Sequence, residues 1–227
     1  MTPEDLAAVM EATWPAARVW REGPFLCRDG AGGGKRVSAA SSAGDWTEAD
    51  LDALDQGLVL VREGETALDR ALAARGWRMV DPVVAYAAPV AELRADLPPL
   101  STFPHWAPLE IVRTIWAEGG IGPERVAVME RAAGKHTAIL ARHADRPAGA
   151  AFVALHGKEA MLHALEVRES LRRSGVGANL LRAAANWAAA EGATRLSLVV
   201  TERNTAARAL YARLGLRNVG QYHYRMK

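Results

Sequence analysis

The amino-acid sequence predicts an α/β (α+β) fold of two similar domains, each a mixed, mostly antiparallel sheet flanked by helices. Three apolar runs at 137–143, 148–156 and 160–167, each bounded by turn residues, are typical of strands in an antiparallel meander. Segments with apolar residues at helical spacing lie between strand-like runs along the chain. Together the two patterns indicate sheets covered by helices.

The length and composition fit two compact domains. The chain has 227 residues, of which 50% are apolar, so a core can form. No apolar run is long enough to span a bilayer, and the first ten residues lack the regions of a signal peptide. The single cysteine, Cys27, can form no internal disulfide, and the His and Cys spacings give no zinc pattern. We therefore expect a cytoplasmic protein without a metal.

The net charge of +2 conceals an asymmetry between the two halves. Residues 1–109 contain 10 Lys and Arg against 16 Asp and Glu, whereas residues 110–227 contain 18 against 10. A basic half attracts anions, either nucleic acid or a phosphorylated cofactor. Because the basic residues are spread along predicted helices without a block interleaved with aromatics, we expect a cofactor and neither nucleic acid nor membrane. Many of these arginines can equally be ordinary solvated helix faces.

In the first half, a helix is predicted from Pro3 to Arg18, with Thr2 as its N-cap, and strands at 25–28 and 36–40. The glycine run between those strands fits neither phosphate-loop spacing, so it predicts a flexible hairpin tip. The further predicted elements are a helix after Thr47, a strand at 58–61, a helix at 66–75, and strands at 77–80 and 83–87.

A proline-rich stretch separates the halves. It predicts a linker at 93–108 between domains at 1–92 and 109–227, the second beginning with helices at 111–118 and 123–132. Residues 58–84 also align without gaps on 197–223, sharing for example Thr66 with Thr205 and Gly76 with Gly215. The common order of strand, helix, glycine and strand predicts a duplication.

The segment 165–211 carries the chemical signal. A strand leads into Arg172-x-x-Gly175-x-Gly177, which begins a helix predicted at 176–190. A glycine turn at a helix N-terminus presents free N–H groups and the positive end of the helix dipole, which bind a pyrophosphate. An ordinary glycine loop is an equal alternative for this motif alone. After the next strand, Asn204 and Tyr211 lie two helical turns apart on one face.

With these residues in place, the second half resembles the GNAT superfamily of N-acyltransferases over residues 110–227. The resemblance rests on LEVRESLRRSGVG at 165–177 and NTAARALYARLGLRNVG at 204–220. Leu216 departs conservatively from the Phe that is frequent there. In the first half the positions of Asn204 and Tyr211 hold Glu65 and Leu72, which implies a degenerate copy that does not bind the cofactor.

The resemblance implies that acetyl-CoA lies in a V-shaped splay between the strands ending at Val167 and Val200. Tyr211 would protonate the leaving thiolate, and Glu166 is the candidate base. His163, His223 and ordered water are alternative routes for the proton. The residues implied to contact acetyl-CoA are Leu165, Glu166, Val167, Arg172, Arg173, Ser174, Gly175, Val176, Gly177, Ala178, Asn204, Ala207 and Tyr211.

The function that follows is an acetyl-CoA-dependent N-acetyltransferase that acts on a small primary amine by direct attack in a ternary complex. The alternatives are an acyl-CoA-binding regulatory module without transferase activity, an acetyltransferase of protein or peptide amines, and a nucleic-acid-binding role for the basic half. The acidic first half points weakly to a cationic acceptor. We expect a monomer or a homodimer.

Overall fold

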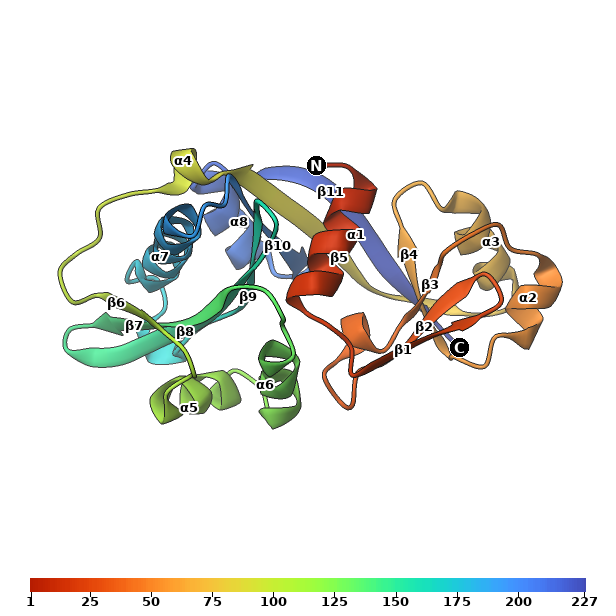
Figure 1. Cartoon of the computed structure of the whole chain (residues 1–227), viewed down its shortest axis with the longest axis horizontal. Helices are drawn as coiled ribbons and strands as arrows, with labels where there is room; N and C mark the ends of the chain where they lie inside the picture. The colour runs from red at the N-terminus through yellow and green to blue at the C-terminus, as the bar shows by residue number, and fades with distance from the viewer.

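The computed structural model describes all residues 1–227, and its strands form one continuous 11-stranded sheet along the molecule (Figure 1). The strand order is β1-β2-β3-β4-β11-β5-β10-β9-β8-β7-β6. The elements are α1 (Pro3–Thr13), β1 (Arg18–Glu22), β2 (Phe25–Asp29), η1 (Lys35–Val37), β3 (Ala40–Ser42), α2 (Glu48–Ala53), β4 (Leu58–Arg62), α3 (Thr66–Ala74), β5 (Arg78–Pro89), α4 (Val90–Leu93), β6 (Thr102–His105), α5 (Glu110–Glu118), α6 (Pro123–Glu130), β7 (His136–His143), β8 (Arg146–His156), β9 (Glu159–Val167), η2 (Glu169–Leu171), α7 (Val176–Ala190), β10 (Arg195–Thr201), α8 (Thr205–Arg213) and β11 (Arg217–Met226).

The predicted mixed, mostly antiparallel sheet flanked by helices is confirmed. Most neighbouring strands pair antiparallel, and the parallel pairs are β3 with β4 and β9 with β10. Alternate residues of β7 and β8 belong to two different cores, one shared with α7 and one with α5 and α6. Helix α7 therefore covers one face of this part of the sheet, and α5 and α6 cover the other.

The two halves exchange strands at the centre of the sheet. β11, from the end of the chain, pairs with β4 and β5, whereas β5, from the first half, pairs with β11 and β10. In Figure 1 these two long strands run together through the middle of the molecule, between its left and right parts, with α1 beside them. The first half thus supplies a strand to the sheet of the second, and the second supplies one to the first.

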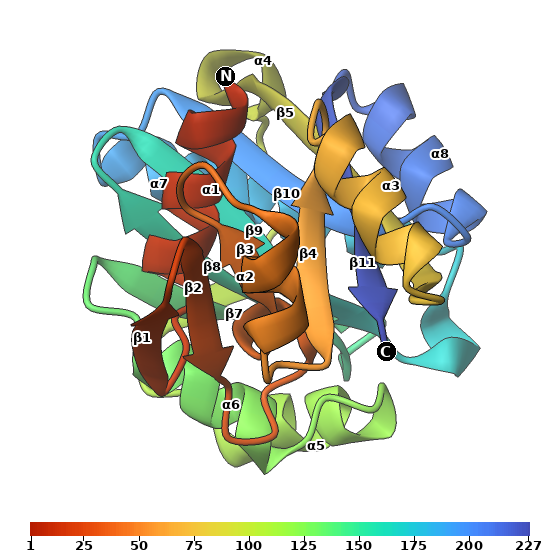
Figure 2. The ribbon, with the colours of Figure 1, turned by 90° about the vertical axis from the view of Figure 1, so that its right-hand side faces the viewer.

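The elements aligned by the internal sequence comparison also correspond in the structure. Helices α3 and α8 begin at Thr66 and Thr205, and strands β5 and β11 begin at Arg78 and Arg217, at the same offset as in the sequence alignment. Figure 2 shows α3 and α8 lying on the same side of the central strands. The duplication remains our proposal, and these equal bounds support it.

Several predicted bounds are wrong, each for a local reason. Helix α1 ends at Thr13 because Pro15 follows, and the next residues form β1, which the sequence did not predict. The strand expected at 36–40 is a 3-10 turn followed by β3. The strands expected at 77–80 and 83–87 are the single strand β5, since Asp81, with φ 43°, forms a bulge opposite β11 and leaves the strand continuous.

The glycine run is a packed loop, in contrast to the flexible tip that was expected. A Cβ on Gly33 would lie 2.4 Å from a methyl of Val128 on α6. Gly34, with φ 98°, lies against the guanidinium of Arg125, also on α6. The glycines therefore allow a loop of the first half to pack closely on a helix of the second. The proline-rich stretch at 93–108, which was expected to be a linker, contains the strand β6, and this strand pairs with β7.

Candidate functional site

Strands β9 and β10 separate after a short paired segment, which forms the expected splay. Their parallel pairing runs from Arg195 opposite Glu159 to Leu198 opposite Leu162. Beyond these residues β9 continues to Val167 and β10 to Thr201 without pairing to each other. The inner edge of each strand end therefore keeps backbone groups that can bond to an extended ligand.

A bulge in β9 turns the strand away from β10. Ala164 has φ 50°, in the left-handed region, and the register with β8 shifts between Ala150 and Phe152. The carbonyl of Ala164 accepts a hydrogen bond of 2.9 Å from Nε1 of Trp116, a fully buried residue of α5. A single indole thus holds the bulge from the neighbouring layer.

The glycine motif forms the expected turn at the start of α7. Gly175 is the N-cap with φ 89°, no side chain caps the helix, and the first-turn N–H groups of Val176, Gly177 and Ala178 have no carbonyl within the helix to bond. A Cβ on Gly177 would lie 3.1 Å from Leu210 of α8, so this glycine also lets the two helices approach. Arg173 adopts φ 64°, which completes the turn.

Arg172 folds back from this turn onto the end of β9. Its Nε donates to the carbonyl of Val167 at 3.3 Å, and its Nη2 lies 3.4 Å from Oε1 of Glu166. The Glu166 side chain packs against Gly119 at the end of α5, where an added Cβ would lie 2.4 Å from Cγ of the glutamate. Arg172 and Glu166 are therefore partners before any ligand binds. Ser174 donates to the carbonyl of Leu171 at 2.6 Å.

Asn204 and Tyr211 lie on α8 as the sequence predicted, Asn204 as its N-cap and Tyr211 in its last turn. Oδ1 of Asn204 accepts from the N–H of Ala207 at 3.1 Å, so the amide caps the helix. Tyr211 is 6% exposed and belongs to a core cluster against which Leu165, Val167 and Val200 also pack. Its burial, together with the negative charge of Glu166, raises its pKa to about 12. The phenol is therefore protonated at any ordinary pH.

Tyr86 is a neighbour of this site that the sequence did not reveal. It lies on β5, so the first half supplies it, and its ring centroid is 6.0 Å from that of Tyr211. Its hydroxyl accepts a hydrogen bond of 3.2 Å from Nε of Arg208 on α8. An aromatic residue within an apolar strand carries no sequence signal of such a role, because the strand exchange alone brings it here.

A cavity of about 260 Å³ opens at the splay, which we call the splay cavity. It is lined by the first unpaired residues of the two strands, His163 and Ala164 on β9 and Val199–Thr201 on β10. The glycine segment Gly33–Arg36 of the first half and Arg125 of α6 line its other walls. The splay is therefore bordered by α7 and α8 on one side and by a cavity between the halves on the other.

The two histidines considered as bases are held by other contacts. Nδ1 of His163 accepts from Nη1 of Arg36 at 3.1 Å, and its Nε2 bonds to Oγ1 of Thr13 at 2.9 Å. Burial, and then the charge of Arg36, hold its pKa well below its usual range, so the ring is neutral with both nitrogens occupied. His223 bonds to Asp69 at 2.6 Å, away from the splay. His163 therefore has no free nitrogen, and His223 does not line the splay cavity, so neither is placed to take a proton from an amine there.

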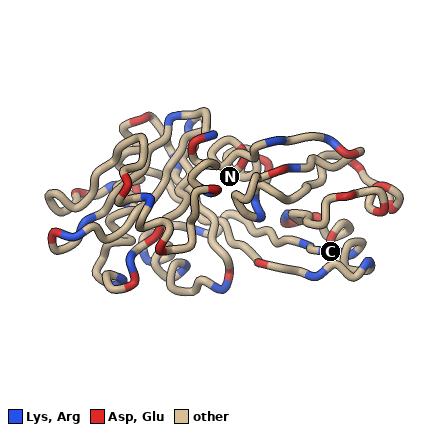
Figure 3. Tube along the Cα trace, turned by 90° about the horizontal axis from the view of Figure 1, so that it is seen from below, with Lys and Arg blue, Asp and Glu red and all other residues tan.

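No group of three or more His, Cys, Asp or Glu residues is arranged to hold a metal ion. Lys and Arg residues are interspersed with Asp and Glu along the whole trace, without a continuous basic stretch (Figure 3). None of the helices combines the length and the apolar character that crossing a membrane requires.

Comparison with known proteins adds to this description. The family described as "Acetyltransferase (GNAT) family" matches residues 106–216. The "Uncharacterized N-acetyltransferase YobR" of Bacillus subtilis is 27% identical over 249 residues, which cover 99% of this chain and 97% of that protein.

Solved structures share the fold. A GCN5-related N-acetyltransferase from Kribbella flavida superposes with a TM-score of 0.74 at 18% identity, covering 98% of this chain and 94% of that one. A tandem GNAT protein from the clavulanic acid biosynthesis pathway gives a TM-score of 0.57 at 15% identity, covering 79% and 66%. At these identities the likeness concerns the fold.

Proposed function

We propose that this chain transfers an acetyl group from acetyl-CoA to a primary amine of a small molecule. The proposal starts from residues 106–216, which match the GNAT acetyltransferase family and make the chain an acyltransferase. The transfer would proceed by direct attack in a ternary complex. One observation carries the proposal. The β9 and β10 ends separate beside a buried, protonated Tyr211 and a glycine turn that begins α7.

The residues at the splay fit acetyl-CoA. The free edge of Leu165–Val167 can pair with the amide-bearing pantetheine arm as an added strand would. The turn from Arg172 to Ala178 offers unbonded N–H groups to the pyrophosphate, and the left-handed Gly175 leaves the approach open, with no atom within 4 Å of where a Cβ would lie. Asn204 and Ala207 on α8 would flank the arm.

Acetyl-CoA would supply the acetyl group as a thioester, and the chain would orient it and manage protons. A backbone N–H near Glu166 would stabilise negative charge on the carbonyl oxygen. Tyr211 would donate its proton to the sulfur as the thioester bond breaks. The amine would approach through the splay cavity, on the side of the sheet away from α7.

Glu166 is proposed as the base that takes a proton from the incoming amine. Replacing Glu166 with Gln is expected to lower kcat/KM by about 10- to 100-fold at pH 7, and by less at pH 9, since more of the amine is then unprotonated without help. The pH profile of kcat/KM measures this. An equal loss of kcat/KM at pH 7 and pH 9 would show that Glu166 is not the base and that its role is the ion pair with Arg172.

Asn204 allows the helix cap to be separated from a contact with acetyl-CoA. Asp caps helices as well as Asn does, so Asn204→Asp should keep the thermal stability, whereas Asn204→Ala should lose about 1 kcal/mol. If the amide N–H₂ contacts the pantetheine arm, both variants should bind acetyl-CoA less tightly in calorimetry. Unchanged binding by Asn204→Asp would restrict the residue to capping.

The test of the proposed function has two parts. Calorimetry should detect acetyl-CoA binding to the full-length protein, and release of free thiol in the presence of an amine panel should detect transfer. Binding without thiol release from any amine would favour a regulatory module that binds acyl-CoA. Transfer to peptide amines in preference to small amines would favour a peptide acetyltransferase.

A further inference from the structure

The splay cavity has an excess of positive charge. Its lining includes Lys35, Arg36 and Arg125 but only one carboxylate, Asp81. Asp81 lies 2.7 Å from Nζ of Lys35 and 3.7 Å from Nη1 of Arg203. These partners hold its pKa below the usual range, so it is ionised and neutralises Lys35. Two guanidinium groups remain without a carboxylate partner in the cavity.

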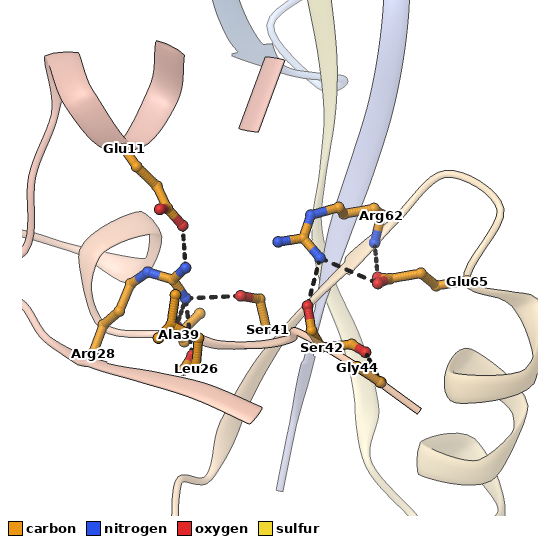
Figure 4. Close-up of polar contacts among 9 residues, drawn as sticks. All are labelled: Glu11, Leu26, Arg28, Ala39, Ser41, Ser42, Gly44, Arg62 and Glu65. Atoms are coloured by element: carbon orange, nitrogen blue, oxygen red, sulfur yellow. Dashed lines mark hydrogen bonds and ion pairs between the residues drawn. The ribbon is translucent and has the colours of Figure 1, made fainter. Parts of the chain in front are cut away.

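The guanidinium groups of Arg36 and Arg125 differ from those of Arg28 and Arg62, which have carboxylate partners. Arg28 is bonded to Glu11 and to Ser41, and Arg62 is bonded to Glu65 and to the carbonyl of Ser42 (Figure 4). The Arg36 side chain, in contrast, has a hydrogen bond only with the neutral His163, lies over the ring of Trp14, and has a buried Nε without an acceptor.

Arg125 is exposed on α6, lies against Gly34 and has no ion pair. A cation in a concave, partly desolvated site attracts a ligand anion more strongly than one on an open surface. The unpaired charge is therefore placed where a ligand anion would be held.

A larger, mostly apolar cavity adjoins the splay cavity. Its volume is about 410 Å³, and it lies between α1 and the strands β4 and β11. The two cavities share Trp14, Arg36 and Tyr222 in their walls. Apolar side chains of α1, such as Leu6 and Met10, line it together with Leu60 of β4. A ligand held at Arg36 can therefore extend an apolar group into this second space.

We propose that the acceptor is a small amine that also carries a carboxylate and an apolar side chain, as an amino acid of the leucine type does. The carboxylate would bind Arg125 and Arg36, the amine would face the splay, and the side chain would enter the apolar cavity. This proposal rests on the transferase function proposed above. It also reverses the expectation of a cationic acceptor, because the charge of a whole half does not determine the charge of its cavity walls.

Binding of product-like ligands tests the proposal without requiring turnover. Ligand-observed NMR on the full-length protein should show N-acetyl-L-leucine binding at least about tenfold more tightly than its neutral amide, because a charge-assisted hydrogen bond is lost in the amide. N-acetylglycine should also bind about tenfold or more weakly than N-acetyl-L-leucine, since it buries no side chain.

Variants assign the binding to the two arginines. Arg125→Gln, at an exposed position that the fold tolerates, should remove most of the preference for the acid, and Arg36→Lys, which keeps the charge but loses the planar fork, should reduce it partly. Arg113→Gln is the control, because it removes an arginine of α5 that is paired with Glu130 outside the cavity. This variant should leave the preference for the acid over the amide unchanged. Equal affinity for the acid and the amide, or a preference untouched by Arg125→Gln, would overturn the carboxylate site.

Turnover separates this proposal from the proposed function. Acetylation of L-leucinamide as fast as L-leucine would refute the acceptor class while leaving the transferase intact. Binding of N-acetyl-L-leucine that depends on Arg125, without acetyl transfer to any amine, would instead refute the transferase and leave the anion site standing. Equal binding of N-acetylglycine and N-acetyl-L-leucine would remove the apolar cavity from the proposal.

Discussion

Replacing Tyr211 with Phe is expected to lower kcat about 100-fold or more while leaving the affinity for acetyl-CoA nearly unchanged. The substitution removes one hydroxyl from a ring that is already part of the core, so the packing of α8 should survive. The raised pKa, about 12, keeps the wild-type phenol protonated, and activity should show no decline from its ionisation below about pH 11. Steady-state kinetics and calorimetry measure the two quantities.

Tyr86→Phe provides a matched control for this prediction. It removes the hydroxyl of the neighbouring ring, which accepts from Arg208, and leaves Tyr211 in place. We expect a change of less than about tenfold in kcat, because the hydrogen bond lost to Arg208 involves no reacting group and acts on catalysis only through the orientation of the ring. Equal losses in both variants would indicate that the aromatic pair matters as a structural unit and that Tyr211 is not the acid.

Replacing Trp116 with Ala is expected to destabilise the fold by about 3–5 kcal/mol. The indole is fully buried in the core of α5 and α6, and its N–H bonds to the carbonyl of Ala164 in the bulge of β9. For a chain of this size such a loss corresponds to a Tm lowered by roughly 10 °C. Thermal unfolding followed by circular dichroism measures it.

Trp116→Phe separates packing from the hydrogen bond. Phe keeps most of the buried ring but leaves the Ala164 carbonyl without its donor, so we expect a loss of about 1–3 kcal/mol. Because Ala164 lines the splay cavity, this variant should also raise KM for the amine at a temperature where it is fully folded. A Tm equal to that of the wild type would show that the bulge holds its shape without the indole.

Much of the proposed acetyl-CoA site was predictable because its parts are local in sequence. A glycine turn, a helix N-terminus and a capping Asn each depend on residues a few positions apart, and the helical period alone places Tyr211 below Asn204. The predicted bounds of α7 agree with the structure. The family resemblance rests on the same local motifs, and the GNAT match over residues 106–216 bears it out.

The proposed acceptor side was not predictable, because its residues come from distant segments. Arg36, Arg125 and Trp14 belong to a glycine loop, a helix and the end of α1, and only packing between the halves brings them together. None of them stands in a motif. The glycine loop was expected to be flexible, whereas its contact with Val128 makes it a wall of the cavity.

The residues alone were enough to predict the glycine turn and the spacing of Asn204 and Tyr211, since backbone conformation and helical spacing follow from near neighbours. The resemblance to the GNAT superfamily added the fold and the role proposed for Tyr211. Only the tertiary structure shows that β5 of the first half pairs with β10, and that β11 of the second half pairs with β4. This arrangement brings Tyr86 of the first half next to Tyr211 of the second. The tertiary structure also decided which arginines lack a partner, since an ion pair depends on which side chains meet in space, and the order of residues does not reveal that.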